Sequence, residues 1–264
     1  MKVGYIGCGN MAQAMIGGMI SSGVIKATQV MASNPSIGKL EQVKQKWGIE
    51  ISQDNQVLAK ACDILILAVK PHFYQQVIEE VKDLLRPEQI LISIAPGKTL
   101  EQLELWVGKR AKIIRAMPNT PALVREGMTA VCGNDLVTQE EIEQICLLFN
   151  GFGKTQVILE RMMDAVIAVS GSSPAYVYLF IEALADGAVR EGMPRDQAYI
   201  FASQAVLGSA RMVLETGKHP GELKDAVCSP GGTTIEAVCK LEETGFRSSV
   251  EQAMKACVDK SRQM

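Results

Sequence analysis

The sequence is poor in the residues that build metal sites. It has only two histidines, and its seven cysteines are scattered without a C-x-x-C pair. Neither a zinc site nor a disulfide framework is therefore indicated. The chain also has little excess charge of either sign: the formal net charge is -2, and no run of like charges occurs. Binding to nucleic acid or to a membrane surface has no electrostatic support.

Long apolar runs are scarce as well. The longest, from Pro174 to Val189, is interrupted by Glu182 and Asp186, so we expect no membrane span. The sequence opens directly into the apolar Val3–Ile6, with no charged leader or cleavage site before it. With its unpaired cysteines, the protein is expected to be cytoplasmic.

The first part of the chain alternates short apolar runs with helix-like segments. Strands are predicted at 2–6, 29–33, 64–69, 89–94, 112–115 and 129–132, and helices near 11–22, 39–47, 73–84 and 99–107. Runs such as Ile64–Val69 are apolar throughout, as expected when both faces of a parallel sheet are covered. The pattern predicts an α/β fold: a Rossmann-type, doubly wound sheet in an NAD(P)-binding domain of residues 1–159.

After Leu159 the composition becomes helical. Pro174 and Pro194 stand where helices could begin, and Gly192 and Gly217 where helices could end. We predict an all-α C-terminal dimerisation and substrate domain of residues 160–264. Its helix from Pro174 is apolar around much of its circumference and needs cover on several sides. A second subunit would supply that cover, which predicts a homo-oligomer, either a dimer or a larger assembly.

A glycine turn follows the first predicted strand and opens a helix. In Gly7-x-Gly9-x-x-Ala12, the first glycine permits the turn and the second lets the backbone approach a pyrophosphate. We predict that Gly7, Cys8, Gly9, Asn10 and Met11 bind a dinucleotide.

The second strand decides which dinucleotide binds. It ends in Ser33-Asn34-Pro35-Ser36, and no carboxylate follows until Glu41. An acidic residue there would bond the ribose 2′-OH of NAD, whereas hydroxyl and amide groups accept a 2′-phosphate without repulsion. Lys39 could add positive charge. NADPH is therefore favoured, and NADH remains an alternative.

Two further loops follow predicted strands. Ala68, Val69, Lys70 and Pro71 end the strand near 64–69 and are expected to flank the cofactor, although a solvated lysine before a turn is the alternative. His72, which comes next, is more simply a surface histidine. Asn119 lies in Met117-Pro118-Asn119-Thr120-Pro121 and would contact the nicotinamide carboxamide or the substrate, unless it only holds the loop.

A second glycine turn, Ser229-Pro230-Gly231-Gly232-Thr233-Thr234, leads into an apolar-spaced helix. Free N–H groups at such a helix start can hold a carboxylate. The general acid that hydroxy-acid dehydrogenases use is missing, since no lysine occurs between Lys154 and Lys218. A C=N substrate arriving as an iminium needs only hydride, positioning and a hydrogen bond, which Thr234 could supply. Cys228 is more simply a packing residue than a nucleophile.

With these motifs the chain resembles the pyrroline-5-carboxylate reductase family over its whole length. The resemblance rests on Gly7–Ala12, Ala68–Pro71, Asn119–Pro121, Val124–Gly127, Ser170–Tyr176, His219–Gly221, Leu223–Asp225, Ser229–Ile235 and Gly245–Arg247. It implies that NAD(P)H reduces L-1-pyrroline-5-carboxylate to L-proline, the last step of proline biosynthesis. It also implies an interlocked dimer, with the substrate pocket at the dimer interface and, in some members, five dimers in a decamer.

The resemblance assigns roles by position. Ser229, Gly231, Gly232 and Thr233 would bind the substrate carboxylate, and Thr234 the ring nitrogen. On the cofactor's adenosine side it implies Ser33, Asn34 and Asn55; nearer the nicotinamide it implies Ala68, Lys70, Pro71 and Asn119. Gly217 and Ala226 depart from polar residues found near the substrate in some members, so those contacts are not expected here.

Two other functions stay open from the sequence. The protein could reduce a different cyclic imine, which competition by proline would help to distinguish. It could instead be a non-catalytic NADPH-binding regulator, although a second anion-binding turn has no purpose in a sensor.

Overall fold

The computed structural model describes residues 1–108 and 110–263. The chain forms two compact units: residues 1–172 with the segment from Cys257 onward, and residues 173–256. The predicted domains, 1–159 and 160–264, divide the chain elsewhere, and residue 264 lies outside the described part.

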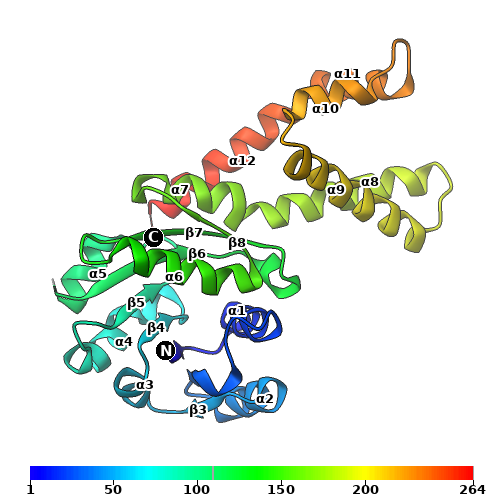
Figure 1. Ribbon diagram of the computed structural model, residues 1–264. Helices are drawn as coiled ribbons and strands as arrows, with labels where there is room; N and C mark the ends of the chain where they lie inside the picture. The colour runs from blue at the N-terminus through cyan, green and yellow to red at the C-terminus, as the bar shows by residue number, and fades with distance from the viewer. Residues whose placement is uncertain (109, 264) are drawn as a thin grey trace. The chain divides into compact units, whose positions relative to one another are not determined.

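Within the described residues, the first unit holds one eight-stranded sheet with the order β3-β2-β1-β4-β5-β6-β7-β8 (Figure 1). The strands are β1 Val3–Ile6, β2 Val30–Ser33, β3 Glu50–Ser52, β4 Ile64–Leu67, β5 Ile90–Ser93, β6 Lys112–Met117, β7 Gly127–Gly133 and β8 Gly153–Val157. The first six strands are parallel and follow the Rossmann order 3-2-1-4-5-6. The predicted doubly wound sheet is confirmed.

Helices cover both faces of this sheet. One apolar core joins the sheet to α1 (Asn10–Ser21), α2 (Ile37–Trp47) and α6 (Gln139–Phe149). Another joins it to α3 (Asn55–Ala61), α4 (Tyr74–Val81) and α5 (Leu100–Val107). Successive strand residues enter opposite cores, as Tyr5 and Ile6 do. This two-sided burial explains why the inner strands are mostly apolar and why β4 is apolar throughout.

Several elements depart from the sequence prediction. The short strand β3, the strand β8 and the helices α3 and α6 were not predicted. β8 reads Gly-Lys-Thr-Gln-Val and is half exposed at the edge of the sheet, so it lacks the apolar signal of an inner strand. β7 runs antiparallel to β6, because residues 118–126 are fewer than the roughly dozen that a parallel crossover needs.

The second unit is helical, as predicted. After α7 (Met163–Val166) and a π-helical turn (Ile167–Gly171) come α8 (Ser173–Arg190), α9 (Arg195–Thr216), α10 (Pro220–Val227), α11 (Thr233–Glu243) and α12 (Phe246–Ser261). Pro194 caps the start of α9, and Gly217, at φ 65°, ends it in the left-handed conformation.

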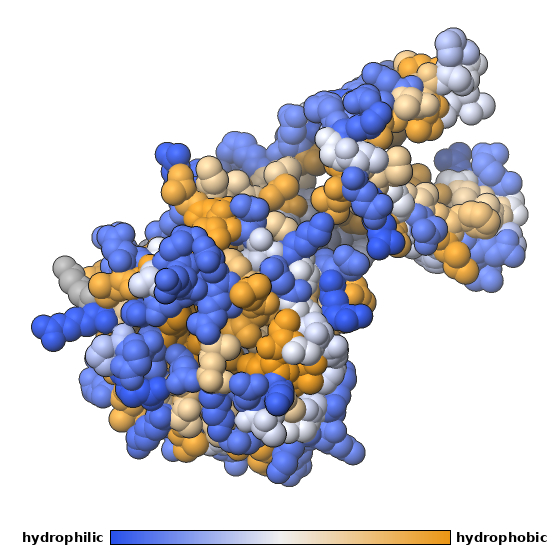
Figure 2. Space-filling model, viewed as in Figure 1, coloured by the Kyte–Doolittle hydropathy of each residue, from blue (hydrophilic) through white to orange (hydrophobic). Residues whose placement is uncertain are grey.

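Helix α8 exposes a large apolar surface. Of its residues only Ala185 is buried, whereas Tyr178 and Leu179 are 60% and 68% exposed. Apolar side chains are visible on the surface of the helical unit in Figure 2. Within this unit a cavity of about 820 Å³ lies between α8, the end of α11 and α12, and Leu184, Leu241 and Phe246 are among the residues that line it. A surface of this kind is typical of a subunit interface.

The expectation about membrane-spanning length needs a correction. Among the described residues, the helical stretch Glu160–Arg190 is long and apolar enough to cross a membrane by length and composition alone. This stretch is longer than the run 174–189, because it also contains the apolar residues before Pro174. A single such helix is weak support for a span, because a helix that packs against a second subunit has the same composition.

Candidate active site

The first glycine turn joins three strands. Gly7 has φ 100°, and its N–H donates to the Ser33 carbonyl at 2.8 Å. A Cβ at Gly7 would lie 2.7 Å from the Ala68 carbonyl oxygen. Only glycine adopts this backbone freely and fits this space. The end of β1 is therefore held against the ends of β2 and β4, which is where a doubly wound fold binds its ligand.

The start of α1 fits the pyrophosphate of a dinucleotide. Gly9 is the N-cap and no side chain caps the helix, so the N–H groups of its first turn are free to bind an anion. A Cβ built on Gly9 meets nothing within 4 Å, so open space faces the turn. Cys8 is buried, and burial raises the pKa of its thiol to about 11. The thiol is neutral near pH 7, so its side chain would not repel a pyrophosphate bound at this turn.

The predicted adenosine-side residues meet at the end of β2. Ser33 is fully buried, and its hydroxyl lies 2.7 Å from Oδ1 of Asn55. Nδ2 of Asn55 donates to a carboxylate oxygen of Glu80 at 2.7 Å. The Asn34 amide donates to the Ser36 carbonyl at 3.4 Å, and Lys39 is exposed. The structure thus brings together Ser33 and Asn55, and it adds Glu80, which no sequence pattern indicated because α4 delivers it from a distant segment.

The end of β4 lies beside β1. The Ala68 N–H donates to the Ile6 carbonyl at 2.8 Å, Val69 is half-buried, and Lys70 is exposed. Pro71 begins a short 3-10 turn, Pro71–Phe73. His72 in that turn is exposed, with its ring 4.1 Å from the Phe73 ring, which confirms a surface histidine.

Asn119 organises its loop. It is only 8% exposed; Oδ1 accepts from the Met128 N–H at 2.8 Å, and Nδ2 donates to the Ser170 carbonyl at 2.9 Å. These bonds tie the loop to β7 and to the π-helical turn. The loop-holding role is therefore present, while a contact with nicotinamide stays a prediction and has one amide N–H left to use.

The second glycine turn forms as predicted. Gly231 has φ 67°, the Gly232 N–H donates to the Ser229 carbonyl at 3.0 Å, and α11 starts at Thr233. Gly232 is the N-cap, and no side chain caps α11. Thr234 is half-buried, and within the described part of the chain its hydroxyl has no hydrogen-bond partner. The turn offers backbone donors for an anion, with the free hydroxyl of Thr234 beside them.

Few proton-transfer groups accompany this turn. The second histidine, His219, caps α10: its Nδ1 accepts from the Gly221 N–H at 3.0 Å. Lys224 forms an ion pair with Asp225, and Arg247 pairs with Glu242 at 2.7 Å. Among the described residues, no group of three or more His, Cys, Asp or Glu side chains could hold a metal ion.

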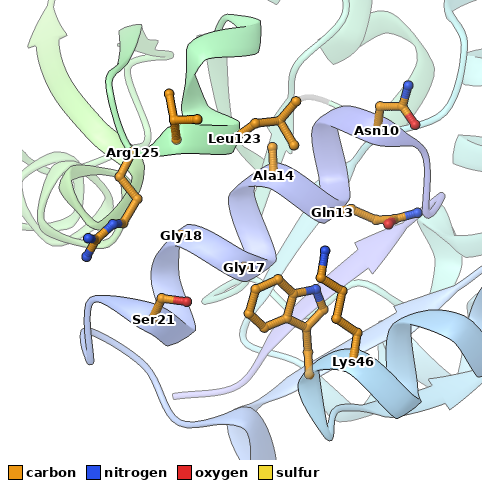
Figure 3. Close-up of a pocket in the computed structure, with 11 residues that line it drawn as sticks. Asn10, Gln13, Ala14, Gly17, Gly18, Ser21, Lys46, Leu123 and Arg125 are labelled. Carbon is orange, nitrogen blue, oxygen red and sulfur yellow. The ribbon is translucent and has the colours of Figure 1, made fainter.

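A cavity of about 380 Å³ lies along α1 (Figure 3). Gly17 and Gly18 face it, and a Cβ at Gly17 would lie 2.4 Å from the indole of Trp47. Asn10 and Gln13 line one end of the cavity, and Leu123 lies over α1 from the loop after β6. Sequence reasoning did not indicate this cavity, since its walls come from three separate segments.

Comparison with known proteins covers both parts of the chain. The family described as pyrroline-5-carboxylate reductase dimerisation matches residues 160–264, and the one described as NADP oxidoreductase coenzyme F420-dependent matches residues 2–97. The chain is 52% identical over 263 residues to a pyrroline-5-carboxylate reductase of Escherichia coli (strain K12), covering 100% of this chain and 98% of the relative. It is 41% identical to that of Arabidopsis thaliana, again covering 100% of this chain and 95% of the relative.

Solved structures agree. A pyrroline-5-carboxylate reductase from Coxiella burnetii superposes with a TM-score of 0.93 at 37% identity, covering 99% of this chain and 97% of that one. A pyrroline carboxylate reductase from Plasmodium falciparum, with NADP bound, gives 0.90 at 35% identity, covering 100% and 97%. The chain belongs to the pyrroline-5-carboxylate reductase family.

Proposed function

We propose that this protein reduces L-1-pyrroline-5-carboxylate to L-proline, with NADPH as the hydride donor and NADH as an alternative donor. The observation that carries the proposal is a pair of uncapped helix starts, at α1 and α11, in a chain that matches this family from end to end. One is preceded by a dinucleotide-type turn, the other by a turn suited to a carboxylate.

The cofactor would be held by residues of the first unit. Gly7, Cys8, Gly9, Asn10 and Met11 would surround the pyrophosphate; Ser33, Asn34 and Asn55 would lie toward the adenosine; and Ala68, Val69, Lys70, Pro71 and Asn119 toward the nicotinamide. When bound, the reduced nicotinamide supplies the hydride that adds to the carbon of the C=N bond. The open space at Gly9 and the close approach of Gly7 to Ala68 support this placement.

The substrate would be held at the start of α11. Ser229, Gly231, Gly232 and Thr233 would bind its carboxylate through the turn, where the free N–H groups lie. Thr234 would hydrogen-bond the ring nitrogen. The nitrogen of an iminium already carries its proton and keeps it in the product, so the site needs no strong general acid. Orientation and the hydrogen bond then account for the contribution of these residues.

The helical region, residues 160–264, would join the subunits. Its exposed apolar residues on α8, among them Tyr178 and Leu179, are what a homodimer or larger homo-oligomer would cover. We also propose a cytoplasmic location, because the described cysteines are all free thiols, as a reducing compartment would keep them. Fractionation of cells that express a tagged chain would test the location.

Turnover of the named substrate tests the proposal most directly. Purified protein is mixed with pyrroline-5-carboxylate and NADPH, NADH is run alongside, and the loss of the reduced nicotinamide's absorbance is followed together with proline formation. We expect oxidation that needs the substrate and is faster with NADPH. Binding of NADPH without any turnover would contradict the activity and leave the nucleotide site in place, pointing to another imine or to a regulator.

A further inference from the structure

A carboxylate reaches the adenosine end of the nucleotide site from an unexpected element. The end of β2 lacks the acidic residue that NAD-binding Rossmann domains place there. Glu80 of α4 brings a carboxylate to this place in the folded structure. Its Oε2 accepts from Nδ2 of Asn55 at 2.7 Å, and Oδ1 of Asn55 lies 2.7 Å from the Ser33 hydroxyl. Glu80 is therefore separated from the end of β2 by a single amide side chain.

The carboxylate also fixes which way Asn55 points. A carboxylate only accepts hydrogen bonds, so the amide nitrogen of Asn55 must face Glu80. The amide oxygen then faces Ser33, and the Ser33 hydroxyl must donate its hydrogen to it. In this arrangement Asn55 and Ser33 have fewer donors free for a phosphate than their side chains alone suggest.

The charge of Glu80 is not neutralised by a neighbouring cation. Its other oxygen accepts from the Gln76 amide at 3.2 Å, and within the described residues it takes part in no ion pair. By contrast, Glu79, the residue before it, pairs with Lys82 at 2.7 Å. Asp54, the N-cap of α3 next to Asn55, adds a second carboxylate. Asn55 thus has a carboxylate bonded to its amide and another on the residue before it.

We infer that Glu80 is a cofactor-selectivity residue, which holds Asn55 toward the adenosine ribose, disfavours a 2′-phosphate and so keeps NADH usable beside NADPH. The inference rests on the proposed function only for the identity of the cofactor. It concerns the adenosine half of the cofactor, so it is tested without turnover.

Two fragments that differ only in the 2′-phosphate serve as probes: adenosine 2′,5′-bisphosphate and adenosine 5′-monophosphate. Their dissociation constants are measured by calorimetry on the wild type and on Glu80→Gln. We expect Glu80→Gln to bind the bisphosphate about fivefold more tightly, relative to the monophosphate, as one removed charge would produce near a dianion. The gain should shrink as salt rises from about 0.05 to about 0.5 M, because screening weakens charge effects.

Glu79→Gln is the matched control, since it removes the same charge one residue away from a side chain that already pairs with Lys82. It should leave the ratio of the two dissociation constants unchanged. Glu80→Gln is also made in an Asn55→Ala background. If the effect passes through Asn55, most of it disappears there; if the charge acts directly on the phosphate, it persists. Either result supports a selectivity role.

The inference is overturned if Glu80→Gln weakens both fragments equally, because that is what a purely structural role produces. It is also overturned if neither fragment binds the wild type. With active enzyme, the ratio of KM for NADH to KM for NADPH should rise in Glu80→Gln at an unchanged kcat. If the wild type shows no turnover of pyrroline-5-carboxylate, the proposed function is refuted, but the result with the two fragments still holds.

Discussion

A Cβ atom on Gly232 would lie 2.4 Å from the side-chain oxygen of Ser229. The turn between α10 and α11 therefore closes tightly enough to exclude even a methyl group at this position, unless the serine side chain moves away. The same serine and glycine both belong to the proposed carboxylate site. Steric fit and substrate binding thus depend on the same contact.

Gly232→Ala should therefore damage substrate binding more than folding. The added methyl group displaces the Ser229 hydroxyl from the turn, so we expect kcat/KM for pyrroline-5-carboxylate to fall by about tenfold or more, equivalent to at least ~1.4 kcal/mol. Steady-state kinetics check this, with NADPH affinity measured separately and expected to stay unchanged. Gly38→Ala is the control, because a Cβ there meets nothing within 4 Å. Wild-type kinetics in Gly232→Ala would remove Ser229 and Gly232 from the site.

Thr234→Ala tests the hydrogen bond to the ring nitrogen. The hydroxyl has no partner in the described structure that its loss would disturb, so the fold should be unaffected. We expect kcat to fall by about 10- to 100-fold, the range for one oriented hydrogen bond in a site, with the Kd of NADPH retained. Thr234→Ser should recover most of the rate. Unchanged turnover in Thr234→Ala would show that another group holds the nitrogen.

The ease of prediction differed between the parts of this chain for physical reasons. β1, β2, β4 and β5 are mostly apolar because both faces are covered, and each lies within the range that the sequence predicts. β8, at a half-exposed edge, has no such constraint on its composition. Both glycine turns were predictable, since Gly7 and Gly231 have a positive φ, a conformation that favours glycine over other residues.

The hydrogen bonds within the site could not be predicted from the sequence. The amide of Asn119 is committed to Ser170 and Met128, and that of Asn55 to Glu80. Each of these contacts joins an amide side chain to a backbone or side-chain group of another segment, and no local pattern in the sequence marks them. Residue types therefore indicate that a loop carries chemistry, whereas only the packed structure shows which of its groups are already used.

The apolar face of α8 should determine the oligomeric state. Leu179 is 68% exposed and borders the cavity between α8, α11 and α12. Leu179→Glu would place a charge on a surface that the assembly must bury, at a cost of several kcal/mol per interface. We expect the mass from light scattering at micromolar concentration to drop toward that of one chain, and turnover to drop with it. Glu191→Gln, at an exposed position after α8, should change neither. A monomeric mass for the wild type would contradict the predicted oligomer.

Alkaline pH should destabilise the first unit through its buried thiols. Burial raises the pKa of Cys8, Cys62 and Cys132 from 9.0 to about 11. Above pH 9 the unfolded chain loses these protons while the folded chain keeps them, so the unfolded state binds fewer protons and stability falls as pH rises to 11. The expected slope is about 1.4 kcal/mol per pH unit for each thiol.

Thermal unfolding measured at steps between pH 9 and pH 11 checks this, with Cys62→Ala as the variant that lacks one of the buried thiols. It should be less stable than the wild type at neutral pH, because a buried side chain is shortened, yet its Tm should fall less steeply with pH. Cys239 is exposed, so Cys239→Ala should keep the wild-type slope. Equal slopes in all three proteins would mean that the Cys62 thiol has the same pKa in the folded and the unfolded chain. In that case the burial of Cys62 would not contribute to the loss of stability at alkaline pH.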